Sequence, residues 1–229
     1  MAKKIVKKRK LRVFRLLLVL FVLAGLFFVV RFYVRLPIEN IIIKNTTYLN
    51  DYYILELAEI RDYPSFLLTS SRKIEGKLKE SPYINKVDVK KSFFNVVTIE
   101  VDENRALFYD NTDKKIIFDN NEAVEVNEIT ENFRIPRLLN YVPDSKYKSF
   151  IKGMKNIKID TLGKISDIEY KPNDFDKDRF LLYMDDGNMV YLTLTKFKMI
   201  NYYNDVLTQL EDKKGILYLD NGNHFQIKE

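Results

Sequence analysis

The amino-acid sequence predicts an α+β protein with one N-terminal transmembrane helix followed by two mixed domains. Three observations lead to this prediction. A single apolar stretch of fifteen residues, Leu16–Val30, holds no charged or hydrogen-bonding side chain. The next segment has the order strand, helix, helix, strand, strand. The remainder holds short strand-like runs separated by Asn, Asp and Gly turns, with two helical segments, which predicts a mixed α/β domain on a largely antiparallel sheet.

The apolar stretch is long enough to cross a membrane only if its flanks are included. A helix rising 1.5 Å per residue needs about 20 apolar residues to cross the bilayer core. Residues 13–34 reach that length if Arg15 and Arg31 extend their charges to the two interfaces. A cleaved signal peptide would need small residues after the apolar run, and residues 27–33 offer none. A buried helix of a soluble protein is the other alternative. We expect an uncleaved anchor over residues 16–34.

Charge predicts the orientation of that anchor. Eight Lys and Arg residues and no acid precede Leu16, so residues 1–15 are expected to form a basic cytoplasmic tail with the rest of the chain outside the cytoplasm. Residues 1–36 hold ten of the 38 bases, leaving 28 bases and 32 acids beyond them, a net charge of −4. The basic segment is therefore interpreted as a topology signal, and no nucleic-acid partner is expected. Because the chain has no cysteine, disulfides cannot stabilise it.

The first domain is predicted from strands at its two ends and two helices between them. The β-branched run Ile38–Lys44 favours a strand, and alternating apolar residues at 86–90 and 97–101 predict an antiparallel hairpin. We expect Pro64 and Pro82 to end the two helices. The helices are predicted from Asn50 as a cap with Ile54, Leu57 and Ala58, and from Ser70 or Ser71 as a cap with Ile74 and Leu78. The buried hairpin face is predicted to carry Val87, Val89, Val97, Ile99 and Val101.

Three segments of this region resemble a POTRA domain. They are residues 38–45 (IENIIIKN), 79–90 (KESPYINKVDVK) and 97–103 (VTIEVDE). A POTRA domain directly after a single N-terminal anchor is similar to the FtsQ/DivIB family of bacterial division proteins. That family usually has a proline in the hairpin turn, where Phe93-Phe94-Asn95 stands here, and often one after the Glu that ends the third strand, where Asn104 follows Glu103. The resemblance implies a POTRA domain at 38–105 and a β domain at 106–229.

The second domain is predicted from turns and periodic runs. Asn and Gly tolerate the left-handed backbone that tight turns need, so Asp119–Glu122 and Asp185–Asn188 are expected to close hairpins. Thr195 is expected to cap a helix that ends at Gly215. The predicted elements are strands at 115–118 and 123–126, a helix at 144–156, strands at 165–170, 180–184 and 189–194, a helix carrying Ile200, Tyr203, Leu207 and Leu210, and closing strands at 216–220 and 224–227.

The closing strands extend the resemblance to the end of the chain. Tyr218-Leu219-Asp220 is similar to the aliphatic-Asp-Leu motif of the family's β domain, with Asn221 where Leu is expected. The resemblance implies a non-catalytic scaffold of the divisome, anchored in the bacterial inner (plasma) membrane at the division septum, which recruits and links septal cell-wall synthesis proteins. The implied partners are divisome membrane proteins that are FtsB/DivIC-like and FtsL-like, with FtsK- or FtsW-like proteins as further candidates.

Residues that carry chemistry are scarce. His224 is the only histidine and cysteine is absent, which excludes a Cys-ligated zinc site and a Cys–His pair. Asp174, Asp176 and Asp178 have the spacing of a calcium loop, but Arg179 stands where Gly is needed and Asp185 where a bidentate Glu is needed. We expect no catalytic, metal or cofactor site. Two alternatives stay open: a POTRA-containing secretion or assembly protein, and a membrane-anchored envelope enzyme.

The last strand is the candidate binding site. A final strand often lies at a sheet edge, where unpaired N–H and C=O groups face outward. Between Ile216 and Ile227 the only charge at neutral pH is Asp220, and there is no proline, so the edge is open to strand addition. We expect a proline at Gln226 to remove one edge donor. In the alternative interpretation, Phe225 and Tyr218 pack on the last helix. In the family that the chain resembles, the end of the β domain binds the partners. Carried over by position from the Tyr218-Leu219-Asp220 match, the resemblance implies these partner-binding candidates: Tyr218, Asp220, His224, Phe225 and Gln226.

Overall fold

The computed structural model describes residues 13–131, 133–209 and 213–228. Residues 1–12 of the predicted basic tail therefore lie outside the described residues, and so does Leu210 of the predicted last helix. Helix α1 spans Val13–Arg35, and none of its residues is buried. At 1.5 Å per residue its 23 residues measure about 35 Å, which exceeds a bilayer core of about 30 Å. By length and composition, α1 can cross a membrane once.

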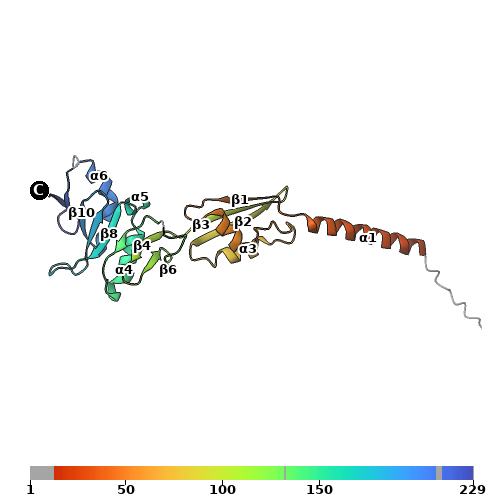
Figure 1. The fold of residues 1–229 in the computed structure, drawn as a ribbon, viewed down its shortest axis with the longest axis horizontal. Coiled ribbons are helices and arrows are strands. Elements are labelled where there is room, and N and C mark those ends of the chain that lie inside the picture. Colours follow the sequence, from red (N-terminus) through yellow and green to blue (C-terminus); the bar gives the residue numbers. More distant parts are fainter. Residues whose placement is uncertain (1–12, 132, 210–212, 229) are drawn as a thin grey trace, which may run out of the picture. The chain divides into compact units, whose positions relative to one another are not determined.

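The described chain divides into two compact units. The first holds residues up to 46, residues 50–80 and residues 87–101, and the second holds the rest. The first unit has a three-stranded sheet of order β1-β3-β2, with β1 parallel to β3 (Figure 1). The five residues predicted for the buried hairpin face are all buried, so that prediction is confirmed. The elements of this region are β1 (Asn40–Lys44), α2 (Asp51–Leu57), α3 (Ser71–Leu78), β2 (Ile84–Ser92) and β3 (Val96–Glu103).

Helix α2 ends earlier than the sequence predicts. Pro64 was expected to end it, but the helix stops at Leu57. Glu59 adopts a left-handed conformation with φ of 53°, and the Ile60 N–H donates to the carbonyl oxygen of Leu55 at 3.1 Å. This combination is a C-terminal helix cap. The local backbone therefore ends the helix before the proline is reached.

The start of α2 and the buried face of α3 follow the predictions. Asn50 precedes α2, and its side-chain oxygen accepts a hydrogen bond from the Tyr53 N–H at 2.8 Å. Such a cap satisfies one of the unpaired donors of the first helical turn. Ser70 precedes α3, and the apolar face of this helix buries Ile74 and Leu78. The spacing of four residues explains why the two side chains share one face.

The end of β3 explains why a short early loop belongs to the second unit. The carboxylate of Glu103 accepts hydrogen bonds from three successive backbone N–H groups, those of Thr47, Tyr48 and Leu49, at 3.0, 2.8 and 3.0 Å. Charge-assisted bonds of this kind are stronger than neutral ones. Burial, and then the neighbouring Glu103 carboxylate, raise the pKa of Tyr48. The loop is thus fixed by one acidic side chain at the strand end.

The second unit is built on a nine-stranded sheet of order β12-β11-β10-β9-β8-β7-β4-β5-β6 (Figure 1). Five of its pairings are antiparallel and three are parallel, as the prediction of a largely antiparallel sheet requires. The elements are β4 (Ala106–Asp110), β5 (Lys115–Phe118), β6 (Ala123–Glu125), β7 (Arg137–Leu138), α4 (Asp144–Lys155), α5 (Ile159–Leu162), β8 (Ile165–Tyr170), β9 (Arg179–Met184), β10 (Met189–Thr193), η1 (Leu194–Tyr202), α6 (Tyr203–Leu207), β11 (Gly215–Tyr218) and β12 (His224–Ile227).

Both predicted hairpins of this unit are present, with the expected turn residues. β5 and β6 pair antiparallel, and Asn121 in their turn has φ of 69°. β9 and β10 pair antiparallel, and Gly187 in their turn has φ of 89°. The helices of the unit share one hydrophobic core with its central strands, so they cover one face of the sheet. That core includes Phe108, Phe150, Met154, Leu162, Ile168, Phe180, Leu182, Val190, Phe197, Ile200, Tyr203 and Leu217.

The segment after β10 is not the α-helix that the sequence predicts. It begins at Leu194 rather than after a Thr195 cap, and it forms a 3₁₀-helix over nine residues before the short α6. Phe197, Ile200 and Tyr203 recur at every third position, and all three are buried. A 3₁₀-helix has three residues per turn. It therefore places Phe197 and Ile200 in one line facing the core, and Tyr203, the first residue of α6, continues that line.

Gly215 has a different role from the predicted helix cap. It is the first residue of β11 and is buried. A Cβ atom at this position would lie 2.0 Å from the carbonyl oxygen of Gln226 on β12. Because any side chain would collide with the neighbouring backbone, glycine is required for β12 to approach β11.

Candidate partner-binding site

The candidate site is the edge formed by β11 and β12. β12 pairs antiparallel with β11 from Gly215↔Ile227 to Tyr218↔His224. β12 is the end strand of the sheet order, so within the part of the chain that the structure describes its other side has no strand beside it. The last strand thus lies at a sheet edge, as expected. Such an edge exposes backbone donors and acceptors to an incoming strand.

The register shows which backbone groups point outward. The Lys228 N–H donates to the carbonyl oxygen of Lys214 at 2.9 Å. Residues of an antiparallel strand alternately face toward and away from their partner, so Gln226 faces β11, whereas Phe225 and Ile227 turn their N–H and C=O groups to the free side. The expectation that a proline at Gln226 removes an edge donor is therefore wrong. That substitution would break the β11–β12 pair instead.

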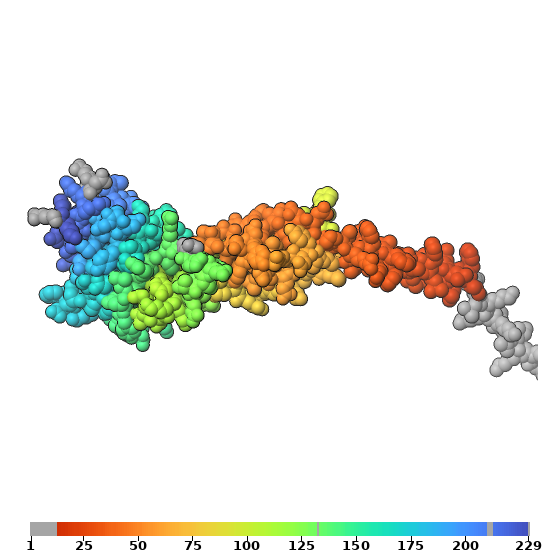
Figure 2. Space-filling model, viewed as in Figure 1, coloured from red at the N-terminus to blue at the C-terminus, as the bar shows by residue number. Residues whose placement is uncertain are grey.

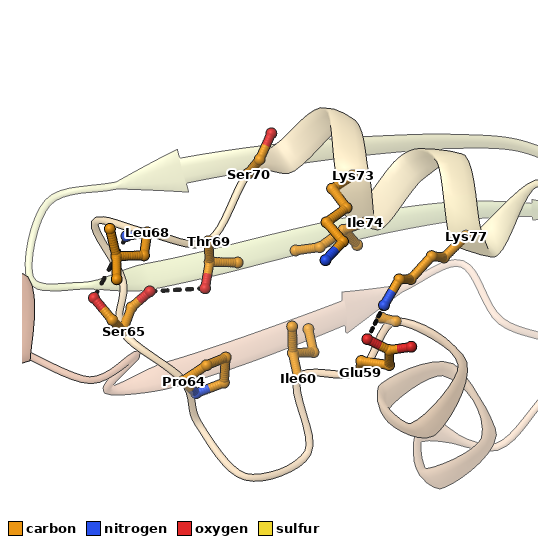
Figure 3. Close-up of a pocket in the computed structure, with 11 residues that line it drawn as sticks. Glu59, Ile60, Pro64, Ser65, Leu68, Thr69, Ser70, Lys73, Ile74 and Lys77 are labelled. Carbon is orange, nitrogen blue, oxygen red and sulfur yellow. Dashed lines mark hydrogen bonds and ion pairs between the residues drawn. The ribbon is translucent and has the colours of Figure 1, made fainter.

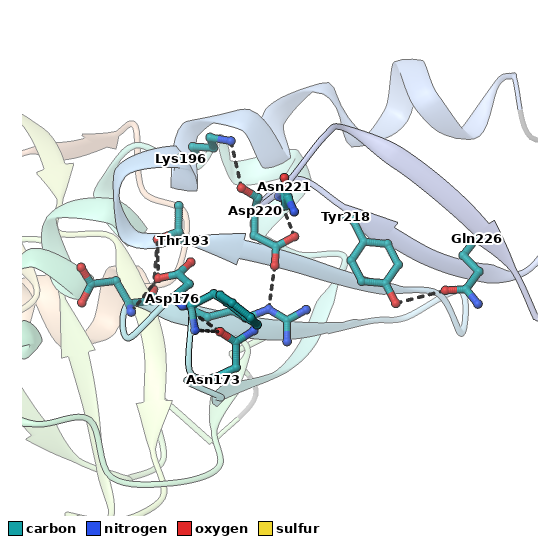
Figure 4. Close-up of polar contacts among 11 residues, drawn as sticks. Asn173, Asp176, Thr193, Lys196, Tyr218, Asp220, Asn221 and Gln226 are labelled. Carbon is teal, nitrogen blue, oxygen red and sulfur yellow. Dashed lines mark hydrogen bonds and ion pairs between the residues drawn. The ribbon is translucent and has the colours of Figure 1, made fainter.

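Three aromatic rings form a ladder across β10, β11 and β12, on the sheet face opposite the helices. Tyr191 lies opposite Tyr218, and Tyr218 lies opposite His224. The ring centroids are 5.4 Å apart for the first pair and 4.7 Å apart for the second, with interplanar angles of 21° and 9°. The Tyr218 hydroxyl donates to Oε1 of Gln226 at 3.1 Å (Figure 4). The ladder therefore runs to the free edge, where His224 and Gln226 are exposed.

Asp220 has a structural role beside this ladder. Its Oδ2 accepts a hydrogen bond from Nε of Arg179 at 2.6 Å, and the two side chains are only 8% and 14% exposed. The Arg179 guanidinium also lies 3.5 Å from the centre of the Tyr191 ring, in cation–π geometry. Lys196 Nζ donates to the carbonyl oxygen of Asp220 at 3.0 Å (Figure 4). The only charge between Ile216 and Ile227 is therefore neutralised inside the protein and does not protect the edge.

Phe225 points to the other face of the sheet. Its side chain is half-buried and packs against the hydrophobic core of the second unit. The alternative interpretation placed this side chain on the last helix; the structure shows it packed against the core, while its backbone faces the free edge. Of the five predicted site residues, the structure brings Tyr218, His224 and Gln226 together on one exposed face. It places Asp220 in an ion pair and packs the half-buried Phe225 side chain against the core.

A hollow next to the ladder is lined by Phe175, a residue that was not predicted from the sequence to belong to the site. The hollow has a volume of about 430 Å³ and is lined by Asn173, Phe175, Asp176, Arg179, Tyr218, Asp220, Asn221 and His224. Phe175 is 98% exposed. A sequence signal did exist, because Phe175 stands alone among polar residues in the loop KPNDFDKD.

The carboxylates of that loop are occupied by other partners. Asp178 pairs with Lys146, and Asp174 lies 3.5 Å from Nζ of Lys177. Asp176 Oδ1 accepts from the backbone N–H of Asp178 at 2.8 Å. Among the described residues, no three His, Asp or Glu side chains are grouped so that they could hold a metal ion. The calcium-like spacing is therefore that of a loop held by its own hydrogen bonds and ion pairs.

Comparisons with known proteins place these features in a family context. A family model described as "POTRA domain, FtsQ-type" matches residues 36–104. The chain is 26% identical to the cell division protein DivIB of Bacillus subtilis, over 97% of this chain and 88% of that protein. It is 30% identical to DivIB of Brevibacillus brevis, over 89% of this chain and 79% of that protein. A solved structure of the major extracytoplasmic domain of DivIB from Geobacillus stearothermophilus aligns with a TM-score of 0.39 and 21% identity, covering 48% of this chain and 96% of that one.

Proposed function

Because this chain belongs to the DivIB family of cell division proteins, we propose that it is a non-catalytic divisome scaffold that recruits and links septal cell-wall synthesis proteins. It is a membrane-anchored cell division protein with α1 as the anchor. The observation that supports the scaffold role best is the open edge of β12 beside an exposed aromatic ladder. The names of the relatives favour this role over secretion or outer-membrane assembly.

Partner binding would proceed by strand addition to β12. An incoming strand can hydrogen-bond to the outward N–H and C=O groups of Phe225 and Ile227, and main-chain bonds of this kind supply affinity. Side chains of that strand would lie beside His224 and Gln226, which gives specificity for one register. The proposed partners are FtsB/DivIC-like and FtsL-like proteins, each contributing an extended segment next to its coiled coil. FtsK- and FtsW-like proteins are further candidates.

The proposed orientation places both units outside the cytoplasm at the division septum. It is supported by the eight basic residues before Leu16, which favour a cytoplasmic N-terminus. A reporter enzyme that is active only outside the cytoplasm should be active when fused after Glu229, and a fluorescent fusion should concentrate at midcell. Reporter activity confined to the cytoplasm would contradict this orientation.

Strand addition is tested by a proline on the outward side of the edge. Ile227 is exposed and its N–H faces outward, so Ile227→Pro removes an edge donor without removing a bond to β11. The matched control is Ala123→Pro on β6, the strand at the opposite edge of the same sheet. The Phe118 N–H bonds to the Glu122 carbonyl oxygen, so by the same alternation the Ala123 N–H also faces outward.

Binding of the full-length chain to the purified partner pair should distinguish the two edges. We expect Ile227→Pro to weaken binding about tenfold or more, because it removes a hydrogen bond worth about 0.5–1.5 kcal/mol and its ring obstructs the added strand. Ala123→Pro should leave binding unchanged. Equal binding by both variants and the parent, with both variants folded, would exclude the β12 edge as the docking site.

A further inference from the structure

We propose that the first unit has a second contact with the membrane, made by two apolar loops that dip into the headgroup region of the same bilayer that holds α1. The loops are the turn between β2 and β3, with Phe93 and Phe94, and the segment 65–69, with Leu67 and Leu68. The proposal rests on α1 being the membrane anchor and is independent of which protein binds β12. Its chemistry is that of a lipid interface.

The four side chains are exposed although they are large and apolar. Phe93 is 91% exposed and Phe94 is 89% exposed, and Leu67 and Leu68 are also exposed. In Figure 2 the end of the β2–β3 hairpin, coloured yellow-green, protrudes from the first unit. Grouped apolar side chains on a soluble surface mark an interaction site with a protein or a membrane.

Backbone hydrogen bonds hold both loops close to the end of α1. The Phe66 N–H donates to the carbonyl oxygen of Leu36 at 2.9 Å, and the Glu39 N–H donates to that of Asn95 at 2.9 Å. Leu36 directly follows α1, whose last residue is Arg35. Glu39 lies four residues beyond Arg35, and four residues span at most about 14 Å. The headgroup layer is roughly 5–8 Å thick on each side of the bilayer core. The 65–69 loop, bonded to the residue directly after α1, is therefore within reach of the interface at which α1 leaves the membrane, and Asn95 of the hairpin turn is bonded to the chain at most about 14 Å from the end of α1.

A lysine joins the two loops. Lys91, at the end of β2, donates from Nζ to the carbonyl oxygens of Phe66 and Thr69, the latter at 2.9 Å. Its ammonium group also lies 4.2 Å from the centre of the Phe66 ring. Figure 3 shows the hairpin turning beside the loop that carries Leu68. Because the ammonium group is fixed in this way, the hairpin turn and the 65–69 loop form one end of the unit.

The turn itself gives a second, independent indication. Phe94 and Asn95 adopt left-handed conformations with φ of 61° and 55°. Asn tolerates this region well, whereas a bulky side chain does so only at a cost in free energy. Phe94 is strained, and its ring is exposed rather than packed, so it contributes little to the stability of the fold. A contact outside the protein explains why an aromatic residue stands there.

Lipid is the occupant that the position favours. Aromatic side chains prefer the interface between the bilayer core and water, and hydrogen bonds join both loops to the first residues after α1. A second amphipathic contact beside a helical anchor would limit how freely the first unit moves on the membrane. A protein partner on the same patch is the competing outcome of the test below.

The chain has no tryptophan, so one introduced tryptophan reports on a single position. The test variant is Phe93→Trp, because Phe93 lies outside the left-handed region and the substitution adds no backbone strain. The matched control is Phe175→Trp, which replaces an exposed aromatic residue in a loop of the second unit. Each full-length chain is placed in nanodiscs of phosphatidylcholine and phosphatidylglycerol without any partner protein. The emission maximum, quenching by lipids with brominated acyl chains and quenching by iodide are then measured.

We expect the emission of Phe93→Trp to shift to shorter wavelength, with quenching by brominated lipids and protection from iodide. Phe175→Trp should show the emission of a water-exposed indole and be quenched by iodide. Two results would overturn the proposal. One is that both variants behave as water-exposed; the other is that Phe93→Trp becomes protected only when the partner pair is added, which would identify a protein-binding surface. Leu68→Trp repeats the test on the second loop if Phe93→Trp does not fold.

Discussion

The ion pair between Arg179 and Asp220 sets the conformation of the candidate site, and breaking it should lower the stability of the second unit. The perturbation is Asp220→Asn, which removes the negative charge while retaining the shape of the side chain. Arg179 is then left with an uncompensated charge at 14% exposure. Removing one partner of a fully buried pair costs about 3–5 kcal/mol. Because both side chains keep slight exposure and the cation–π contact with Tyr191 remains, we expect about 2–3 kcal/mol.

The measurement is urea unfolding of the full-length chain, followed by the near-ultraviolet circular dichroism of its tyrosines. The control is the double variant Arg179→Met with Asp220→Asn, in which neither position carries a charge, since the cost of the single variant comes from the unpaired charge of Arg179. It should recover most of the loss in unfolding free energy. A loss below about 0.5 kcal/mol, the range of ordinary surface substitutions, would refute the assigned role. So would a double variant that is as unstable as the single one.

Three further predictions concern other parts of the fold. Ile99→Ala should lower the unfolding free energy by about 2–4 kcal/mol because Ile99 is fully buried. A loss below about 0.5 kcal/mol in urea unfolding, as for a surface substitution, would mean that the buried sheet face is misassigned. Phe94→Asn should raise the unfolding free energy by about 0.5–1 kcal/mol by relieving left-handed strain, and a decrease in the same assay would show that Phe94 packs. Tyr203 donates to Asp186 at 2.8 Å, and burial, then this hydrogen bond, raise its pKa. The neutral phenol therefore stabilises the fold fully below its ordinary pKa of 10.0, and that contribution is lost as pH rises above it. Tyr203→Phe should cost about 1.5–3 kcal/mol at neutral pH and reduce the alkaline loss of stability, and an unchanged pH profile would contradict the assignment.

The elements that the sequence predicted well are those with local signals. Alternation marks Val97, Ile99 and Val101 on β3, and left-handed turn residues mark both hairpins through Asn121 and Gly187. β4 lacked such a signal, because its residues are buried on both faces and show no alternation. β7 has only two residues and is held between β4 and β8 by parallel pairing. The local sequence of so short a strand gives no indication of its pairing.

In the candidate site, too, features with a local sequence signal were predicted and features set by strand pairing were not. The place of β12 as the last predicted strand indicated an edge, and the absence of charge and proline along it indicated that this edge is open to strand addition. The contact between Arg179 and Asp220 joins residues 41 positions apart, and the direction of the Gln226 N–H depends on register with β11. Both follow from strand pairing in three dimensions. The sequence therefore located the edge strand but assigned Asp220 and Gln226 roles that their positions in the sheet do not support.

Amide hydrogen exchange of the full-length chain, with and without the partner pair, tests the proposed docking at β12 most directly. We predict that exchange at Phe225 and Ile227 slows when the partners are added, because their outward N–H groups become hydrogen-bonded. Exchange at Gln226, whose N–H already faces β11, should change much less. Partner binding that leaves the exchange of Phe225 and Ile227 unchanged would contradict strand addition at this edge.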